Sequence, residues 1–336
     1  MGASGRMVIK VTKVSYQTLP AVLGLTLGAL MIGAAVFAPR ALASQAPPAM
    51  EAFWVGDASA PMYVERLAPA EGPSQPHPLV LVHGAGQTGA ATWLATPDGR
   101  EGWAPYFVRR GFTTYVVDLP GHGRSGQPPD FPHWSGLRYV EPLEALLART
   151  GPALVVTHSM GGRVGWKLAE RAPERLAGLF AVTPAPPPNL VPPGATPLPE
   201  DAPYYQPPDF QRAALTNTPT FPLDAWDQFV GRLVPESARA VNEGRNAAGP
   251  ELNAGPDALR GIPAVALAAD LDAADPPALV RRSADYFGIP MLQTDIDWGL
   301  PGHGHMLMLE RGNLELAARV ADWLEQAGRR DSGVAP

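Results

Sequence analysis

The sequence contains no cysteine, which excludes disulfides, thiolate metal sites and a cysteine nucleophile. Lysine is scarce, and Lys167 is the only one after residue 43. Because residues 1–43 hold four cations and no acid, the rest of the chain has 22 cations against 32 acids, a charge of −10. An acidic body repels phosphate backbones, so we do not expect a nucleic-acid partner.

The overall composition is that of a globular protein. Hydrophobic residues make up 46 % of the chain and charged residues 17 %, which argues against a disordered, collagen-like or coiled-coil protein. A length of 336 residues allows one large domain or one domain with an insertion.

The first 43 residues have the order of an export signal. Cations within residues 6–13 precede an uncharged run over residues 14–39, and the small residues Ala41 and Ala43 follow. This order is typical of a secretory signal, so we expect cleavage after Ala43 and a periplasmic or secreted protein. The run over residues 14–39 is also long enough to be an uncleaved membrane anchor, which is the alternative and the one way in which a membrane becomes a partner.

The body alternates apolar runs with amphipathic stretches. Six apolar runs predict strands at residues 78–83, 112–118, 153–157, 179–182, 262–268 and 289–294. Helical spacing predicts helices at residues 103–110, 137–149, 162–171, 277–287 and 314–326. This alternation predicts an α/β fold, with a mostly parallel sheet and helices on both faces, formed by residues 44–182 and 262–336. Ligands of such sheets bind beyond the carboxyl ends of the strands.

Residues 183–261 interrupt this alternation. Residues 183–208 contain eleven prolines, so they cannot form a regular helix or a central strand. Helix-like pieces follow at residues 223–233 and 237–242, and aromatic residues recur throughout the segment. We interpret the segment as a proline-rich cap or lid inserted over the active site, the alternative being a disordered linker.

The strongest chemical signal is Ser159. It lies between a buried strand and a helix that begins with Gly161 and Gly162, small residues that let strand and helix backbones approach closely. A serine at such a turn exposes its hydroxyl above the sheet, beside the N–H of the next residue, Met160. Thr157 occupies the place of the glycine that usually leads this turn.

A serine hydroxyl needs a base, usually a histidine oriented by a carboxylate. The loop before the last helix offers His305, which we favour, and His303. A metal-binding pair is the other interpretation of these histidines, but alternating side chains of an extended loop point apart and no acidic cluster adjoins them. For the carboxylate we favour Asp272, a short step past the strand at 262–268, with Asp270 and Asp275 as rivals.

Two glycine-rich turns complete the picture. Residues 83–86 follow the first predicted strand, and the N–H of Ala85 is our candidate for a second oxyanion donor beside that of Met160. We expect His83 to brace this loop by hydrogen bonds rather than to transfer protons. Residues 118–125 lack the pattern of a phosphate-binding loop and indicate a structural turn below the active site.

Taken in chain order, these motifs resemble the α/β-hydrolase superfamily over residues 76–328. The resemblance depends on His83-Gly84-Ala85-Gly86, Asp118-Leu119-Pro120-Gly121-His122-Gly123-Arg124-Ser125, the turn at Ser159, and Gly304-His305. It implies the order nucleophile, acid, base, which Ser159, Asp272 and His305 follow.

Within the superfamily, Thr92-Trp93 and residues 96–103 resemble a smaller group of exported bacterial esterases. Some members place a glutamate just after the strand that follows the nucleophile helix, where this chain has no acid in Val182-Thr183-Pro184. Some carry paired cysteines in the oxyanion loop, where this chain has Ala85-Gly86.

The resulting hypothesis is a cofactor-free and metal-free serine esterase that cleaves a small hydrophobic ester or lactone through an acyl-enzyme intermediate. Five tryptophans are candidates for an apolar pocket, although each one taken singly is more typical of the core: Trp93, Trp103, Trp134, Trp226 and Trp298. The alternatives are a lipase, a C–C bond hydrolase, a perhydrolase, an acyltransferase, or a non-catalytic binding protein on the same fold. Dehalogenase and epoxide-hydrolase chemistry are disfavoured, because those relatives use aspartate where Ser159 stands.

Overall fold

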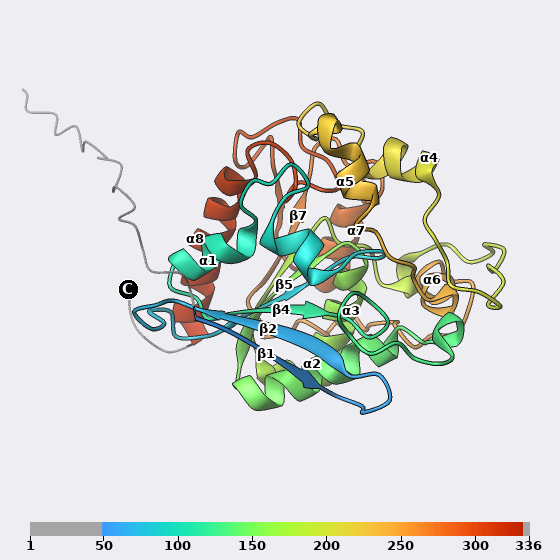
Figure 1. Ribbon diagram of the computed structural model, residues 1–336, viewed down its shortest axis with the longest axis horizontal. Coiled ribbons are helices and arrows are strands. Elements are labelled where there is room, and N and C mark those ends of the chain that lie inside the picture. Colours follow the sequence, from blue (N-terminus) through green and yellow to red (C-terminus); the bar gives the residue numbers. More distant parts are fainter. Residues whose placement is uncertain (1–48, 332–336) are drawn as a thin grey trace, which may run out of the picture. The chain divides into compact units, whose positions relative to one another are not determined.

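A computed structural model describes residues 49–331, so the predicted export signal lies outside the described residues. The chain forms one eight-stranded sheet in the order β1-β2-β4-β3-β5-β6-β7-β8 (Figure 1). The strands are β1 (Ala49–Val55), β2 (Met62–Ala68), β3 (Leu79–Val82), β4 (Thr114–Asp118), β5 (Ala153–His158), β6 (Leu176–Val182), β7 (Ala264–Ala268) and β8 (Met291–Gln293). Strands β3 to β8 are mutually parallel, which confirms the predicted α/β fold.

The antiparallel hairpin of β1 and β2 was not predicted. It joins the sheet through β2, which pairs antiparallel with β4. The edge strand β1 is largely exposed, and β2 carries Glu65 and Arg66 in its middle. Neither strand therefore has the continuous apolar run that reveals a strand buried on both faces.

Helices cover both faces because the side chains of the central strands alternate. In β5, Val155 packs towards α2 (Leu137–Thr150) and α3 (Met160–Arg171), whereas Leu154 and Val156 pack towards α1 (Trp103–Arg109) and α8 (Asn313–Asp331). Helix α7 (Pro277–Phe287) packs against β7. Figure 1 shows the two helical layers on either side of the sheet.

Residues 183–261, here called the cap segment, connect β6 to β7. They contain α4 (Pro208–Phe210), α5 (Trp226–Val230), α6 (Ala238–Gly244) and several single turns. Aromatic packing holds part of the segment together, since the ring of Phe229 lies 5.4 Å from that of Phe221 and 5.9 Å from that of Trp226. The hydroxyl of Ser237 caps α6 by accepting the N–H of Ala240.

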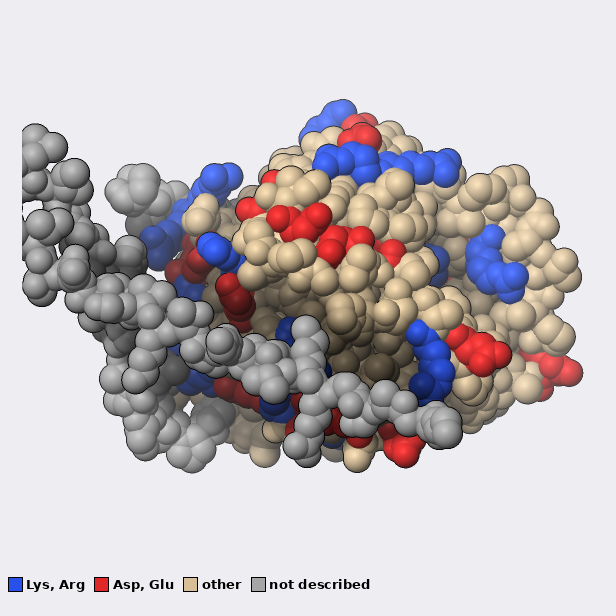
Figure 2. All heavy atoms as spheres, turned by 90° about the horizontal axis from the view of Figure 1, so that it is seen from above, with Lys and Arg blue, Asp and Glu red and all other residues tan. Residues whose placement is uncertain are grey.

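The upper face of the molecule carries charges of both signs, scattered over a mainly uncharged surface (Figure 2). Neither charge sign therefore dominates this face. No helix within the described part of the chain combines the length and apolar character needed to cross a bilayer.

Candidate active site

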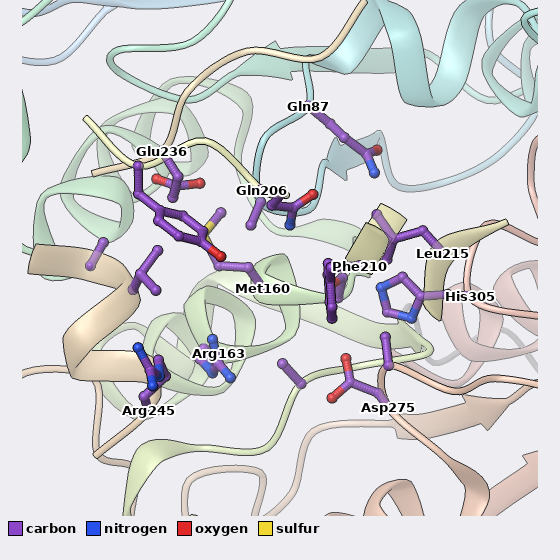
Figure 3. Close-up of a pocket in the computed structure, with 17 residues that line it drawn as sticks. Gln87, Met160, Arg163, Gln206, Phe210, Leu215, Glu236, Arg245, Asp275 and His305 are labelled. Atoms are coloured by element: carbon purple, nitrogen blue, oxygen red, sulfur yellow. The ribbon is translucent and has the colours of Figure 1, made fainter. Parts of the chain in front are cut away.

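A cavity of about 410 Å³ lies where the loops after β3, β5 and β7 meet the cap segment. Ser159, His305 and both oxyanion candidates line it, together with cap residues such as Tyr204 and Phe210 (Figure 3). The carboxyl ends of parallel strands thus deliver the predicted residues to one place.

Ser159 occupies a strained turn. Its φ of 53° and ψ of −121° are values that non-glycine residues rarely adopt. The turn is held by three backbone hydrogen bonds: the Ser159 N–H donates to Val182 O (3.2 Å), and its carbonyl accepts from Gly162 (2.7 Å) and Ala185 (2.9 Å). The surrounding backbone therefore fixes the position of the serine side chain.

Glycine is required around this turn because backbones meet there. A β-carbon on Gly161 would lie 2.7 Å from the His83 carbonyl oxygen, and one on Gly84 would lie 3.0 Å from the Ser159 β-carbon. The start of α3 therefore lies directly against the end of β3 and the loop that follows it, with no room for a larger side chain at Gly161.

His305 is paired with Asp272. Its Nδ1 lies 2.9 Å from Oδ2 and 3.1 Å from Oδ1 of that carboxylate. Asp272 is itself oriented by the N–H groups of Ala274 (2.8 Å) and Asp275 (2.9 Å), which donate to Oδ1. An imidazole held through Nδ1 has Nε2 available for proton transfer.

Both partners are buried, and the charges around them set the basicity of the histidine. Burial by itself would lower the pKa of His305, but the adjacent Asp272 carboxylate outweighs burial and raises it above the usual value. Within residues 49–331, no hydrogen bond joins Ser159 Oγ to the His305 ring, although both side chains line the cavity. Such bonds are often long before substrate binds.

The backbone of His305 is anchored as well. Its carbonyl oxygen accepts from His158 Nε2 at 3.0 Å and from the Thr183 hydroxyl at 3.3 Å. These contacts tie the late loop to the ends of β5 and β6.

The rival residues have other partners. His303 Nδ1 lies 3.0 Å from the buried Glu310 carboxylate, so the two candidate histidines face different acids. Asp270 accepts the N–H groups of Gly302 (2.8 Å) and His303 (3.0 Å) and the Thr294 hydroxyl (3.0 Å). These two residues shape the loop that carries His305, and neither lines the cavity.

Asp275 does line the cavity, close to His305 (Figure 3). Burial raises its pKa to about 6, and the Asp272 carboxylate adds to that effect, while His305 and Arg163 oppose it. Asp275 is therefore a second acid near the histidine, with an environment unlike that of Asp272.

The two oxyanion candidates come from the loop after β3 and from the start of α3. Ala85 and Met160 both line the cavity, and neither N–H donates a hydrogen bond to another residue in the described part of the chain. Met160 is the first residue of α3, where N–H groups lack intrahelical partners. Backbone N–H donors without a partner are the kind of group that binds a developing oxyanion.

The loop that carries Ala85 is held by hydrogen bonds from the loop after β4 and from the cap segment. His83 Nε2 accepts the N–H of Leu119 at 3.0 Å, the bracing contact expected from the sequence. From the cap segment, Val234 donates its N–H to Gly86 O at 2.9 Å, and Glu236 accepts the Gly86 N–H at 3.4 Å.

Glu236 is a site residue that the sequence analysis missed. Its buried carboxylate accepts the Tyr139 hydroxyl at 2.6 Å and lies 3.1 Å from His122 Nε2. Although burial would lower the pKa of His122, the Glu236 carboxylate raises it overall. Nothing in the local sequence marks Glu236 except that it precedes the helix cap Ser237.

The structure does not place the tryptophan candidates in the cavity wall. None of the five named tryptophans lines the cavity; Trp93 and Trp103 instead lie fully buried against each other, with ring centroids 5.8 Å apart. Tyr204 and Phe210 provide the aromatic walls. Within residues 49–331, no group of three or more histidine and acidic side chains is placed to hold a metal ion.

Comparison with known proteins is consistent with this geometry. A family model described as "Alpha/beta hydrolase family" matches residues 79–319. A probable secreted lipase from a fungus (Fungal sp.) is 27 % identical over 340 residues, covering 79 % of this chain and 86 % of the lipase.

Solved structures share the fold. A thermophilic esterase from Thermogutta terrifontis superposes with a TM-score of 0.56 at 17 % identity, covering 83 % of this chain and 99 % of the esterase. A 2-hydroxy-6-oxo-6-phenylhexa-2,4-dienoate hydrolase from a Rhodococcus species gives the same TM-score at 21 % identity, covering 82 % and 99 % of the two chains.

Proposed function

This chain belongs to the alpha/beta hydrolase family, and we propose that it is a serine hydrolase that cleaves carboxylic esters or lactones through an acyl-enzyme intermediate. The observation that carries the proposal is the pairing of His305 Nδ1 with Asp272, in a cavity that Ser159 also lines. Similarity to a probable secreted lipase supports ester substrates.

In the first stage, Ser159 Oγ attacks the acyl carbonyl while His305 Nε2 takes its proton. The carbonyl oxygen becomes an oxyanion, which the N–H groups of Ala85 and Met160 stabilise. The intermediate collapses, the C–O bond to the alcohol breaks, and His305 returns the proton to the leaving oxygen. Asp272 stays ionised and stabilises the imidazolium.

In the second stage, water replaces the alcohol. His305 takes a proton from water, whose oxygen attacks the acyl carbon of the ester formed with Ser159. Collapse of this intermediate releases the acid and returns the proton to Ser159. No metal or organic cofactor is required by this sequence of steps.

The substrate is proposed to be a small ester. A cavity of about 410 Å³ holds a ligand of modest size, and side chains of Ala185, Leu215 and Ala240 give it apolar walls. The secreted relative and the signal-like residues 1–43 together support an exported enzyme, periplasmic or secreted.

The test is a panel of p-nitrophenyl esters of increasing acyl length, assayed with the wild type, Ser159→Ala and Ser59→Ala. Ser59 is an exposed serine and serves as the matched control. We expect Ser159→Ala to lose at least about 10³-fold in kcat/KM while Ser59→Ala keeps wild-type turnover. Equal turnover by wild type and Ser159→Ala would remove Ser159 from the mechanism.

A further inference from the structure

Two arginines line the cavity without an acidic partner. Arg163 and Arg245 are both lining residues, and neither forms an ion pair with any residue in the described part of the chain. Figure 3 shows them together on one side of the cavity, with His305 and Asp275 on the other. The mechanism proposed above uses neither arginine.

Arg163 is held so that its charge faces the cavity. It lies on α3 one turn after Ser159, and its Nε donates to the carbonyl of Pro186 at 3.1 Å. A β-carbon on Gly244, the last residue of α6, would lie 2.3 Å from one of its terminal nitrogens, so that glycine makes room for the guanidinium. The other N–H groups of the fork remain available.

The acids nearby do not neutralise Arg163 directly. Glu236 is committed to His122, Tyr139 and the Gly86 N–H. Asp275 lies on the histidine side of the cavity, and its carboxylate is not within ion-pair distance of either arginine. Both arginines are half-buried, and Asp275 and Glu236 act on the charge of Arg163 only from a distance. An anionic ligand in the cavity would give the guanidinium groups a direct partner.

Accepting the serine-hydrolase function proposed above, we infer that Arg163 and Arg245 bind a carboxylate, so that the preferred substrate is an ester that also carries a free acid. The scissile carbonyl lies at Ser159 and the free carboxylate at the arginines. Met160, Ala185 and Val241 also line the cavity, and these apolar side chains suit a short methylene chain.

The two arginines give the cavity a preference for anions that the face in Figure 2 does not have. The face in Figure 2 mixes both charge signs, whereas a guanidinium recognises a carboxylate with paired, charge-assisted hydrogen bonds. Discrimination between an acid and its neutral counterpart is therefore expected inside the cavity.

The experiment compares monomethyl esters of unbranched dicarboxylic acids of four to eight carbons with the same esters in which the free acid is a carboxamide. Hydrolysis is followed by pH-stat at pH 8 with the full-length protein. At the best length, we expect the wild type to prefer the acid over the amide by about tenfold in kcat/KM. The Arg245 side chain makes no hydrogen bond to a described residue. We therefore expect Arg245→Gln to abolish this preference for the acid, mainly by raising KM.

Arg163→Gln should act in the same direction, and Arg163→Lys should retain part of the preference because it keeps the charge. Arg260→Gln is the matched control, since Arg260 is exposed and pairs with Asp257 outside the cavity. The inference is overturned if the wild type shows no preference or favours the amide, which would mean that Asp275 offsets the arginines.

Failure of the proposed function gives a different result. In that case neither the acid series nor the p-nitrophenyl esters are turned over in a Ser159-dependent manner. The arginine site is then tested by calorimetric titration of the wild type and Arg245→Gln with adipate. Binding of adipate by the wild type, weakened about tenfold in Arg245→Gln, supports the site. Equal binding by the two proteins, or no binding by the wild type, rejects it.

Discussion

The Cγ2 methyl of Thr157 lies 2.9 Å from the point that a β-carbon on Gly165 would occupy. Thr157 stands where the resemblance to the α/β-hydrolases places a glycine before the nucleophile, and that glycine would let the following helix approach the strand. Here the space comes from the helix instead, because α3 presents Gly165 to the larger strand residue. In this chain the strand therefore carries the larger residue, Thr157, and the helix carries the glycine, Gly165.

This relationship predicts energetic coupling between the two positions. Gly165→Ala should lower the free energy of unfolding by about 1–3 kcal/mol, because the new methyl overpacks against Thr157. In the double variant with Thr157→Ala the contact is gone, and the intrinsic helix preference of alanine over glycine is recovered. We expect an interaction energy of about 1–2 kcal/mol in a urea-denaturation double-mutant cycle. Simple additivity of the two changes would contradict the account.

The choice among the three aspartates predicts different kinetic effects. Asp272→Asn removes the carboxylate that orients His305 and stabilises the imidazolium, so kcat for a p-nitrophenyl ester should fall by roughly 10²–10⁴-fold. Asp270→Asn is the matched control, because among residues 49–331 the Asp270 carboxylate bonds only to the backbone of residues 302–303 and to Thr294. It should lower stability and cost less than about tenfold in kcat. An active Asp272→Asn enzyme would exclude Asp272 as the acid.

The fold was predictable where burial leaves a pattern in the sequence. Strands β3 to β7 are almost fully buried on both faces, so they appear as short apolar runs, and the glycines after Ser159 mark the close approach of α3. The hairpin β1–β2 escaped prediction because an exposed edge strand and a partner with charged residues in its middle lack such a run.

The site residues could be predicted from the sequence only where neighbouring residues mark them. Ser159 can be identified from the residues next to it in the sequence. The pairing of Asp272 rather than Asp270 with His305, in contrast, depends on the backbone N–H groups of residues 274 and 275, which orient the Asp272 carboxylate. Glu236 and Arg163 meet their partners across long stretches of chain. A single sequence holds no signal for contacts that are set by tertiary packing.

The contacts of Glu236 predict that this cap residue controls the oxyanion loop. Glu236→Gln should weaken its hold on His122 and on the Gly86 N–H, so that the donor on Ala85 moves out of line. We expect a fall in kcat of about tenfold with little change in KM, since complete loss of an oxyanion donor costs about 10²–10³-fold.

The control for Glu236→Gln is Glu243→Gln. Glu243 is also a buried cap-segment acid, but it accepts the Gly136 N–H and pairs with Arg239, away from the oxyanion loop. It should affect stability more than kcat. If both variants lower kcat equally, the effect of Glu236 is a general loosening of the cap segment and not a specific hold on the loop.

Asp275 predicts a pH dependence of stability whose sign is fixed by its burial. Its pKa is raised from an ordinary 3.8 to about 6 in the folded protein, mainly by desolvation. Near pH 3 the acid is largely protonated in both states and costs almost nothing. As pH rises the unfolded state ionises first, so stability falls, and the full cost is present from about pH 7 upwards. Asp275→Asn removes this titration. The variant should therefore gain about 3 kcal/mol relative to wild type between about pH 3 and pH 7, with His305 titrating in both proteins. Urea denaturation at several pH values measures the difference, and Asp285→Asn, an exposed acid on α7, controls for the loss of one negative charge. A difference between Asp275→Asn and wild type that does not change with pH would show that this carboxylate is solvated in the folded protein.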